Sequence, residues 1–208
     1  MAYMNAAGMN VHGFSLDSSG AIVSIPRLPL SLDGEDGVFE WRVTSPDDKE
    51  KIIAQLDRLL EGGDEAHDFL RQRAALMVDE MLENALYAAP RDANGKQLFH
   101  KGAKRAVLPG ECITVRCAFN GERLSLEVSD NWGSLSTETA LHFISLNLDS
   151  ENIESDRAGR GLFFMWHFMD DFYVSVKPGE ETAIGGALSL YPHLNETGAG
   201  NYGTTIQD

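Results

Sequence analysis

Three features of the sequence predict an α/β fold, a two-layer sandwich in which helices cover one face of a mixed β-sheet. Two stretches before residue 90 carry apolar side chains at helical spacing. Asn120-Gly121 separates two stretches in which apolar and polar residues alternate, the strongest short-range signal of a β-hairpin. Two further strand-like stretches follow an apolar helix near the C-terminus. These elements bury their apolar sides best when the helices pack together on the sheet.

The first half of the chain predicts one strand and two helices. Residues 38–44 alternate in the manner of a half-buried strand. Ser45-Pro46 suits the N-cap and first position of a helix, which Gly62-Gly63 ends. A longer helix is expected over residues 64–89, before a basic loop.

The second half predicts a hairpin, two helices and a closing pair of strands. The helix that begins in GRGLFFMWHFM is apolar nearly all round, which predicts that it is buried. The expected elements are strands 112–119 and 123–129, helices 136–148 and 159–169, and strands 172–176 and 182–191.

The chain is expected to form one domain with two extensions. Residues 38–192 hold the predicted elements, consistent with the usual size of a domain. Residues 1–37 are rich in Gly, Ser and Asp and are predicted to form an N-terminal arm or an edge-strand extension, with a strand at 21–25. Residues 193–208 are predicted to be a flexible C-terminal tail.

The composition of the chain argues against some classes of binding partner and indicates where the protein is located. The net charge is −15 and the 17 Lys and Arg residues are scattered, which argues against nucleic acid and against an anionic membrane surface. No apolar run is long enough for a transmembrane helix, and the N-terminus lacks the features of a signal peptide. Cys112 and Cys117 point to opposite faces of one predicted strand, so a disulfide between them is not expected, and both are predicted to be reduced, buried thiols. These features predict a cytoplasmic protein.

Glu80 and Asn84 are the first candidate site residues. They lie four apart in VDEMLENALYAAP and therefore share one face of the predicted helix. A carboxylate and an amide oxygen so placed suit Mg²⁺, and the carboxylate also suits the activation of an attacking hydroxyl or water. The alternative is a solvated polar patch on an amphipathic helix.

Three further patterns are weak when taken one at a time. Asp130 ends a predicted strand at a loop, where it suits an exocyclic amine such as that of adenine, or merely starts a turn. Gly159-Arg160-Gly161 opens a helix whose free amides and adjacent guanidinium suit phosphate. Thr182 begins a late strand after a glycine-containing turn.

Taken together and in their order along the chain, these four patterns resemble the motifs of the GHKL ATPase superfamily. Because the predicted protein is short and has a single domain, it is most similar within that superfamily to the anti-sigma-factor serine kinases of bacteria. The resemblance covers residues 38–191. EMLENAL matches the N box well and GRGL matches the second glycine box well. The resemblance implies a Bergerat-type sandwich and, as cofactors, ATP and Mg²⁺.

The resemblance also implies a role for each candidate residue. Glu80 corresponds to the catalytic or water-orienting carboxylate and Asn84 to the Mg²⁺ ligand. The nucleotide-binding positions comprise the adenine-reading Asp130, Gly133 in the first glycine box, the phosphate-binding Gly159, Arg160 and Gly161, and Thr182 near adenine.

The sequence departs from the family at three places. Trp132 stands where the first glycine box, Asp-x-Gly-x-Gly, has its first Gly, so its indole either fills the adenine pocket or stacks at its mouth. Ala88 stands four after Asn84, where the family often has His. The segment 134–158, in the place of the ATP lid, contains no glycine.

The leading hypothesis is a bacterial regulator that binds ATP·Mg²⁺ and phosphorylates or sequesters a partner protein of the sigma-factor or anti-sigma-antagonist type. The alternative is a degenerate GHKL module that does not turn ATP over and serves as a protein-interaction domain. A histidine kinase is disfavoured because no phosphoacceptor helix precedes the domain. A metalloenzyme is disfavoured because the six histidines lack ligand spacing. Related single-domain kinases associate, so a homodimer through the N-terminal arm is a further hypothesis.

Overall fold

A computed structural model of the chain describes residues 38–136, 138–140, 160–192 and 203–207. Several expectations lie outside these residues: the N-terminal arm with its strand at 21–25, most of the helix expected over 136–148, Gly159, and the tail over 193–202. Of the helix expected over 136–148, residues 138–140 are helical.

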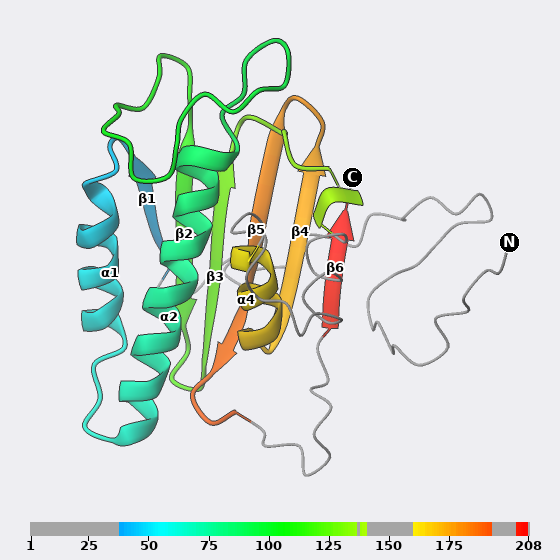
Figure 1. The fold of residues 1–208 in the computed structure, drawn as a ribbon. Helices are drawn as coiled ribbons and strands as arrows, with labels where there is room; N and C mark the ends of the chain where they lie inside the picture. Colours follow the sequence, from blue (N-terminus) through cyan, green and yellow to red (C-terminus); the bar gives the residue numbers. More distant parts are fainter. Residues whose placement is uncertain (1–37, 137, 141–159, 193–202, 208) are drawn as a thin grey trace, which may run out of the picture.

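A six-stranded sheet forms one layer of the domain, in the order β1-β2-β3-β5-β4-β6 (Figure 1). The first five strands in this order pair antiparallel, and β6 runs parallel to β4, so the sheet is mixed. The strands are β1 (Phe39–Val43), β2 (Ile113–Phe119), β3 (Arg123–Asp130), β4 (Asp171–Lys177), β5 (Glu181–Ser189) and β6 (Gly203–Gln207).

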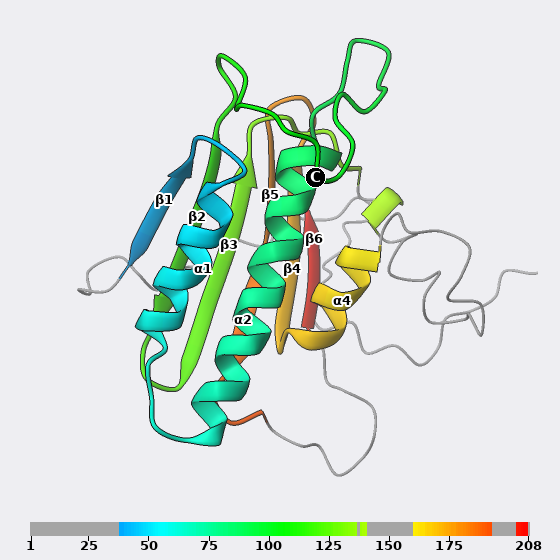
Figure 2. The same cartoon turned by 60° about the vertical axis from the view of Figure 1, so that its left-hand side comes forward.

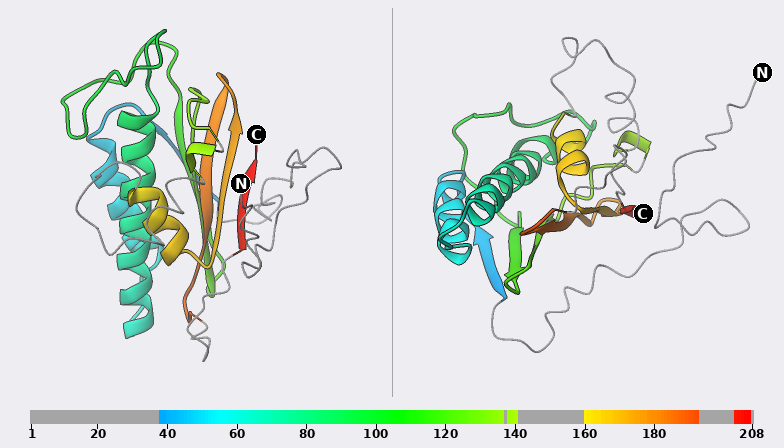
Figure 3. Two further views of the ribbon diagram at one scale, coloured as in Figure 1. Left: turned by 45° about the vertical axis from the view of Figure 1, so that its right-hand side comes forward. Right: turned by 90° about the horizontal axis from the view of Figure 1, so that it is seen from below.

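Helices form the second layer. They are α1 (Asp48–Leu59), α2 (Glu65–Glu83) with its π-helical extension η1 (Asn84–Ala88), and α4 (Arg160–Phe168). All of them lie on the same face of the sheet, as the view from below shows (Figure 3). The predicted α/β architecture, a mixed sheet covered on one face by helices, is therefore confirmed.

The hydrophobic core lies between the two layers. Alternate side chains of β3 point to the helices, and Leu124, Leu126 and Val128 are buried there. They pack with buried residues of α2, among them Met77 and Met81. Asp130 continues this series by two positions, so its side chain also points to the helix layer at the end of the strand.

The first helix begins later than Ser45-Pro46 predicts. The hydroxyl of Ser45 does accept a hydrogen bond from the backbone N–H of Asp47, at 3.2 Å, but the helix starts only at Asp48. The Asp48 carboxylate accepts from the backbone N–H groups of Thr44 and Ser45, at 2.9 and 3.1 Å. The helix therefore has no side-chain N-cap hydrogen bond, and the Asp48 carboxylate instead binds backbone N–H groups of the residues that precede the helix.

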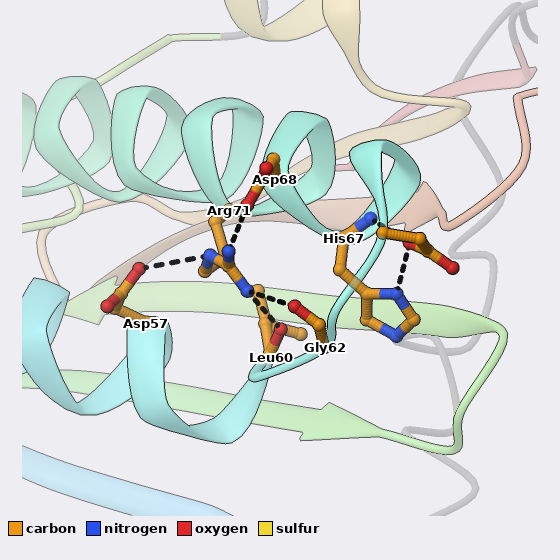
Figure 4. Close-up of polar contacts among 7 residues, drawn as sticks. Asp57, Leu60, Gly62, His67, Asp68 and Arg71 are labelled. Carbon is orange, nitrogen blue, oxygen red and sulfur yellow. Dashed lines mark hydrogen bonds and ion pairs between the residues drawn. The ribbon is translucent and has the colours of Figure 1, made fainter.

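The connection between α1 and α2 is fixed by polar contacts (Figure 4). Asp64 is the N-cap of α2 and accepts from the backbone N–H of His67 at 2.9 Å. Arg71 on α2 donates to the carbonyl of Leu60 at 3.0 Å and pairs with Asp57 of α1 at 3.3 Å. These contacts anchor the start of the long helix whose far end carries the candidate residues.

That far end is a π-helical turn, where the sequence predicts a regular helix over 64–89. α2 ends at Glu83, and η1 runs from Asn84 to Ala88. The backbone N–H of Ala89 donates to the carbonyl of Asn84 at 2.8 Å, which closes a wider turn than an α-helix has. Single π turns of this kind are frequent at functional sites.

The sequence predicts that the apolar helix after Gly159 is buried, and this prediction is wrong for one side of it. Leu162 and Met165 are buried against the rest of the domain, but the large rings of Phe164 and Phe168 are exposed. α4 packs on α2 and on β4, and this packing covers only one side of the helix.

Two smaller predictions have clear outcomes. Both cysteines are free thiols, as predicted; Cys117 faces the core and Cys112, five residues earlier, does not. Burial raises the pKa of the Cys117 thiol to about 12, so it stays protonated. Among the residues that the structure describes, no helix has the length and apolar character needed to cross a membrane.

The C-terminal segment differs from the expected flexible tail over five residues. β6 (Gly203–Gln207) pairs in parallel with β4, in a register that places Thr205 opposite Tyr173. The remainder of the tail, 193–202 and 208, lies outside the described residues.

Candidate functional site

Most of the candidate residues lie at one end of the sandwich. There α2 ends, α4 begins, β3 ends and β5 begins, and α2 lies beside α4 (Figure 2). Four separate elements thus bring together residues that are up to about a hundred positions apart in the chain: Glu80, Asn84, Asp130, Gly161 and Thr182.

Glu80 and Asn84 face the N-terminus of α4. A Cβ atom added to Gly161 would lie 2.5 Å from Glu80 Oε2 and 3.7 Å from Asn84 Nδ2, so the first turn of α4 approaches both side chains. Asn84 Nδ2 is buried without a hydrogen-bond partner among the described residues. A buried amide normally finds a partner, so this one is available to a group that enters from outside the protein.

Glu83 lies between these two residues in the sequence but has a structural role. Its carboxylate pairs with Lys49 of α1 at 2.8 Å, and Lys49 also pairs with Asp79 at 2.7 Å. Burial alone lowers the pKa of Lys49, but the hydrogen bonds that its ammonium group donates to Asp79 and Glu83 outweigh that effect and raise the pKa. Glu83 therefore ties α1 to α2, while Glu80 and Asn84 have no such explanation among the described residues.

Asp130 and Thr182 form a second pair. They lie directly opposite each other in the β3–β5 ladder, so their side chains are neighbours on the helix-facing side. Asp130 is 6% exposed and Thr182 is 2% exposed. The Thr182 hydroxyl is buried without a partner among the described residues. Leaving such a group unsatisfied costs about 1–3 kcal/mol, so a ligand that bonds it recovers that cost.

The environment of Asp130 favours its protonated form. Burial is the main cause and raises the pKa of this carboxyl to about 7, with smaller contributions in the same direction from the charges of Glu111 and Glu181. Hydrogen bonds from the backbone N–H groups of Trp132 and Gly133 oppose the rise. A buried carboxyl with a pKa near neutrality is typical of functional sites.

Gly133 has a packing role beside Asp130. Its φ of +54° is one that side-chain-bearing residues seldom adopt. A Cβ atom here would lie 2.2 Å from the carbonyl oxygen of Lys177, so the turn after β3 packs directly on the β4–β5 turn. Gly179 N donates to the Gly133 carbonyl at 3.0 Å in the same contact. The glycine is therefore needed for this packing, whatever role it has toward a ligand.

The indole of Trp132 points away from Thr182. Its Nε1 donates to Glu111 Oε1 at 3.0 Å, and Glu111 precedes β2, on the opposite side of β3 from β5. Of the two positions that the sequence leaves open, filling the pocket or lining its mouth, this hydrogen bond favours the second.

Sequence reasoning missed Glu111 and its partner Arg105. They form an ion pair whose side chains are almost completely buried. In the sequence both residues belong to a polar, basic loop, and no periodicity or motif distinguishes them. A single acidic residue just before a predicted strand was the only available signal.

The remaining candidates are less well placed. Arg160 is the first residue of α4 and is partly buried. Gly159 lies outside the described residues. Among the described side chains, no group of three or more His, Cys, Asp and Glu converges in a way that suits a metal ion. A cation at Asn84 would therefore take most of its ligands from phosphate and water, as Mg²⁺ commonly does.

No protein-family model matches the chain, and no curated protein matches it either.

Proposed function

We propose that this protein binds ATP·Mg²⁺ at the end of the sandwich where α2 ends and α4 begins, and that its fold is a Bergerat-type variant of the α/β sandwich. One observation carries the proposal: of the four buried side-chain polar atoms that lack a hydrogen-bond partner among the described residues, two, Asn84 Nδ2 and the Thr182 hydroxyl, lie at positions that the motifs assign to the nucleotide. Two such groups at one end of a domain are better explained by a ligand than by chance.

The two pairs suit opposite ends of the nucleotide. Asp130 and Thr182 form the base end, where the ionised carboxylate accepts a hydrogen bond from the exocyclic amine of adenine and the hydroxyl bonds the ring. Asn84 and the first turn of α4 form the phosphate end, where an amide oxygen holds the metal and free backbone amides meet phosphate oxygens. Bound Mg²⁺ supplies neutralisation of phosphate charge.

The reaction proposed is transfer of the γ-phosphoryl group to a serine of a small partner protein. The serine oxygen attacks phosphorus, Glu80 takes the hydroxyl proton, and ADP leaves with the bond to the γ-phosphorus broken. Such transfers depend mainly on positioning and charge neutralisation, and in this proposal Asn84, Arg160 at the start of α4 and the N-terminus of that helix supply both. A cytoplasmic regulator of the anti-sigma-factor kinase type fits this chemistry.

The second candidate is a module that has lost turnover and acts by binding a partner protein. The replacement of the first family glycine by Trp132 favours it, as do the exposed rings of Phe164 and Phe168 on α4. Exposed apolar groups of this size on one helix are typical of interaction surfaces.

Calorimetry with ATP and Mg²⁺ tests the proposal directly. We expect Asn84→Ala and Asp130→Ala each to weaken binding at least tenfold, which corresponds to about 1.4 kcal/mol. Asn94→Ala and Asp57→Ala are the matched controls, because both residues are exposed and neither is among the candidate site residues. The absence of any binding by the wild type at millimolar ATP would refute the proposal and favour the interaction module.

A further inference from the structure

A buried ion pair connects the two ends of the candidate site. The side chains of Arg105 and Glu111 are 1% and 0% exposed, and Arg105 Nη2 donates to Glu111 Oε2. Arg105 Nη1 donates to the carbonyl of Leu86, within η1. The guanidinium also lies 4.1 Å from the centre of the Phe99 ring. The pair therefore reaches the π turn that begins with Asn84.

The carboxylate of the same pair reaches the turn that follows Asp130. Glu111 Oε2 accepts from the backbone N–H of Leu108 at 2.7 Å, and Oε1 accepts from Trp132 Nε1 at 3.0 Å. The backbone N–H of Trp132 in turn donates to Asp130 Oδ1 at 2.9 Å. Two hydrogen bonds donated by Trp132 thus connect the Glu111 carboxylate to the carboxyl group of Asp130, the residue proposed to bind adenine.

Neighbouring contacts hold the same turn in place. Asn131 Oδ1 accepts from the backbone N–H of Cys112 at 2.7 Å, and Asn131 Nδ2 donates to the carbonyl of Gly110 at 2.8 Å. Glu111 therefore lies between two residues that also bind this turn. The segment 110–112 and the turn after β3 are thus joined by hydrogen bonds on both sides of Glu111.

Stability alone does not account for a buried ion pair. Removing two charges from water costs more free energy than their attraction commonly returns, and apolar replacements are often neutral or stabilising. The use of such a pair here needs another explanation, and two of its hydrogen-bond partners, Leu86 and Trp132, lie on different sides of the candidate site.

We propose that Glu111 is a positioning residue of the nucleotide site. Through Trp132 it holds the turn that carries Asp130, and through Arg105 it holds the turn that carries Asn84, so that the base and metal ends keep a fixed separation. This inference rests on the proposed function, since it assigns a role within the same ATP site. It also gives Trp132 a part in the site, as the residue that transmits the position of Glu111.

The pKa of Asp130 can be measured to test this proposal, because it depends on the charges around the carboxyl group. Glu111 acts on it from the start of β2 and Glu181 from β5, and both raise its pKa. Arg105 compensates the charge of Glu111, and Lys177 pairs with Glu181 at 3.6 Å. Removing the charge of Glu111 alone therefore lowers the pKa of Asp130 from its value of about 7.

The test measures the Asp130 carboxyl in the ligand-free protein by carbon NMR across pH, and ATP affinity across the same range. Asp130→Asn identifies the resonance by its absence. In Glu111→Gln we expect the Asp130 titration and the pH profile of ATP binding both to move to lower pH. Glu127→Gln is the matched control. Glu127 lies on β3, as Asp130 does, but on the opposite face of the strand, and this substitution also removes a buried carboxylate.

Trp132→Phe is a second variant that keeps the charge of Glu111 and removes only the indole N–H. We expect ATP affinity at pH 8 to fall roughly tenfold, near the lower end of the effect of losing one hydrogen bond to a charged group. The Asp130 titration in this variant stays near 7 or moves higher, because the turn that donates to the carboxyl is less constrained.

The two possible failures have different signatures. An Asp130 titration that is the same in Glu111→Gln, Glu127→Gln and wild type overturns the positioning role, even if ATP binds. Wild-type protein that binds no ATP at millimolar concentration overturns the proposed function, while the titration still reports whether Glu111 acts on Asp130. A shift in both measurements, confined to Glu111→Gln, supports the inference.

Discussion

Strand β3 carries two buried carboxylates, Glu127 and Asp130, which differ in their surroundings. Glu127 points to the face away from the helices, where it accepts a hydrogen bond from the hydroxyl of Tyr173 and lies 3.8 Å from Arg116. Asp130 points to the helix layer, accepts only backbone N–H groups in the described structure, and has Thr182 as a neighbour without a partner. Burial alone therefore does not distinguish the two carboxylates, but the side chains around them do.

The largest expected effect is on the free energy of unfolding, which should respond differently when each of these two carboxylates is replaced by an amide. The folded-state pKa of Asp130 is about 7, against 3.8 for the unfolded chain, so the folded state retains a proton that the unfolded state releases. Stability conferred by this group is present below about pH 4 and is lost as pH rises through 7. We expect Asp130→Asn to raise the free energy of unfolding at pH 8, by up to about 4 kcal/mol, and to change it little near pH 4.

Glu127→Gln is expected to act in the opposite direction. It weakens a satisfied buried contact and should lower stability by about 1–3 kcal/mol, at pH 8 and at lower pH alike. Urea unfolding of both variants at several pH values measures the difference. A loss of stability in Asp130→Asn at pH 8 similar to that in Glu127→Gln would contradict the comparison.

Two glycines allow the same contrast between a structural region and the candidate site, with smaller expected effects on stability. A Cβ atom at Gly185 would lie 2.5 Å from the Tyr173 hydroxyl and 2.7 Å from the backbone carbonyl of Leu126, which cannot yield. A Cβ atom at Gly161 would meet the end of the Glu80 side chain, which can rotate away. We expect Gly185→Ala to cost about 1–3 kcal/mol of stability with ATP affinity unchanged.

Gly161→Ala should show the reverse pattern. We expect a cost in stability below about 1 kcal/mol and a loss of ATP affinity of fivefold or more, because the added methyl group displaces Glu80 and narrows the approach to α4. Thermal unfolding and calorimetry on the same samples measure both quantities. Equal losses of ATP affinity in both glycine variants would mean that Gly161 lies outside the site.

The smallest changes in stability are expected on α2, where Glu80 and Glu83 form a similar contrast. Glu83→Gln weakens the ion pairs with Lys49 and should cost about 0.3–1 kcal/mol. Glu80→Gln should leave stability and ATP affinity near wild type but lower phosphoryl transfer at least about a hundredfold, the usual contribution of a general base. Release of radiolabelled γ-phosphate from ATP measures the proposed turnover; an unchanged rate in Glu80→Gln would remove this residue from the chemistry.

The sequence predicts the layers of this fold well because their signals are local. Helical spacing before residue 90, and Asn120-Gly121 between two alternating stretches, each depend on neighbouring residues only. The elements that the sequence does not predict depend on distant contacts. β6 is a short segment that is ordered by pairing with β4, and the exposed side of α4 follows from where that helix packs.

The candidate site is predictable to a similar extent. The motifs single out Glu80, Asn84, Asp130 and Thr182, and the structure brings these residues to one end of the domain. Their proposed roles toward ATP stay predictions. Glu111 escapes sequence reasoning because its importance lies in what it contacts, Arg105 and Trp132, and those pairings exist only after folding.

The π turn also affects how this sequence is compared with others. In η1 the amide that lies over the carbonyl of Asn84 belongs to Ala89, whereas in an α-helix it would belong to Ala88. A sequence alignment that assumes an α-helix after Asn84 therefore assigns each of the remaining helical positions to the residue one place too early in this chain. This geometry is what a one-residue insertion absorbed within a helix would produce. Deleting one residue from 85–88 would restore a regular helix, but it would turn the segment that leads to Arg105 away from its present direction.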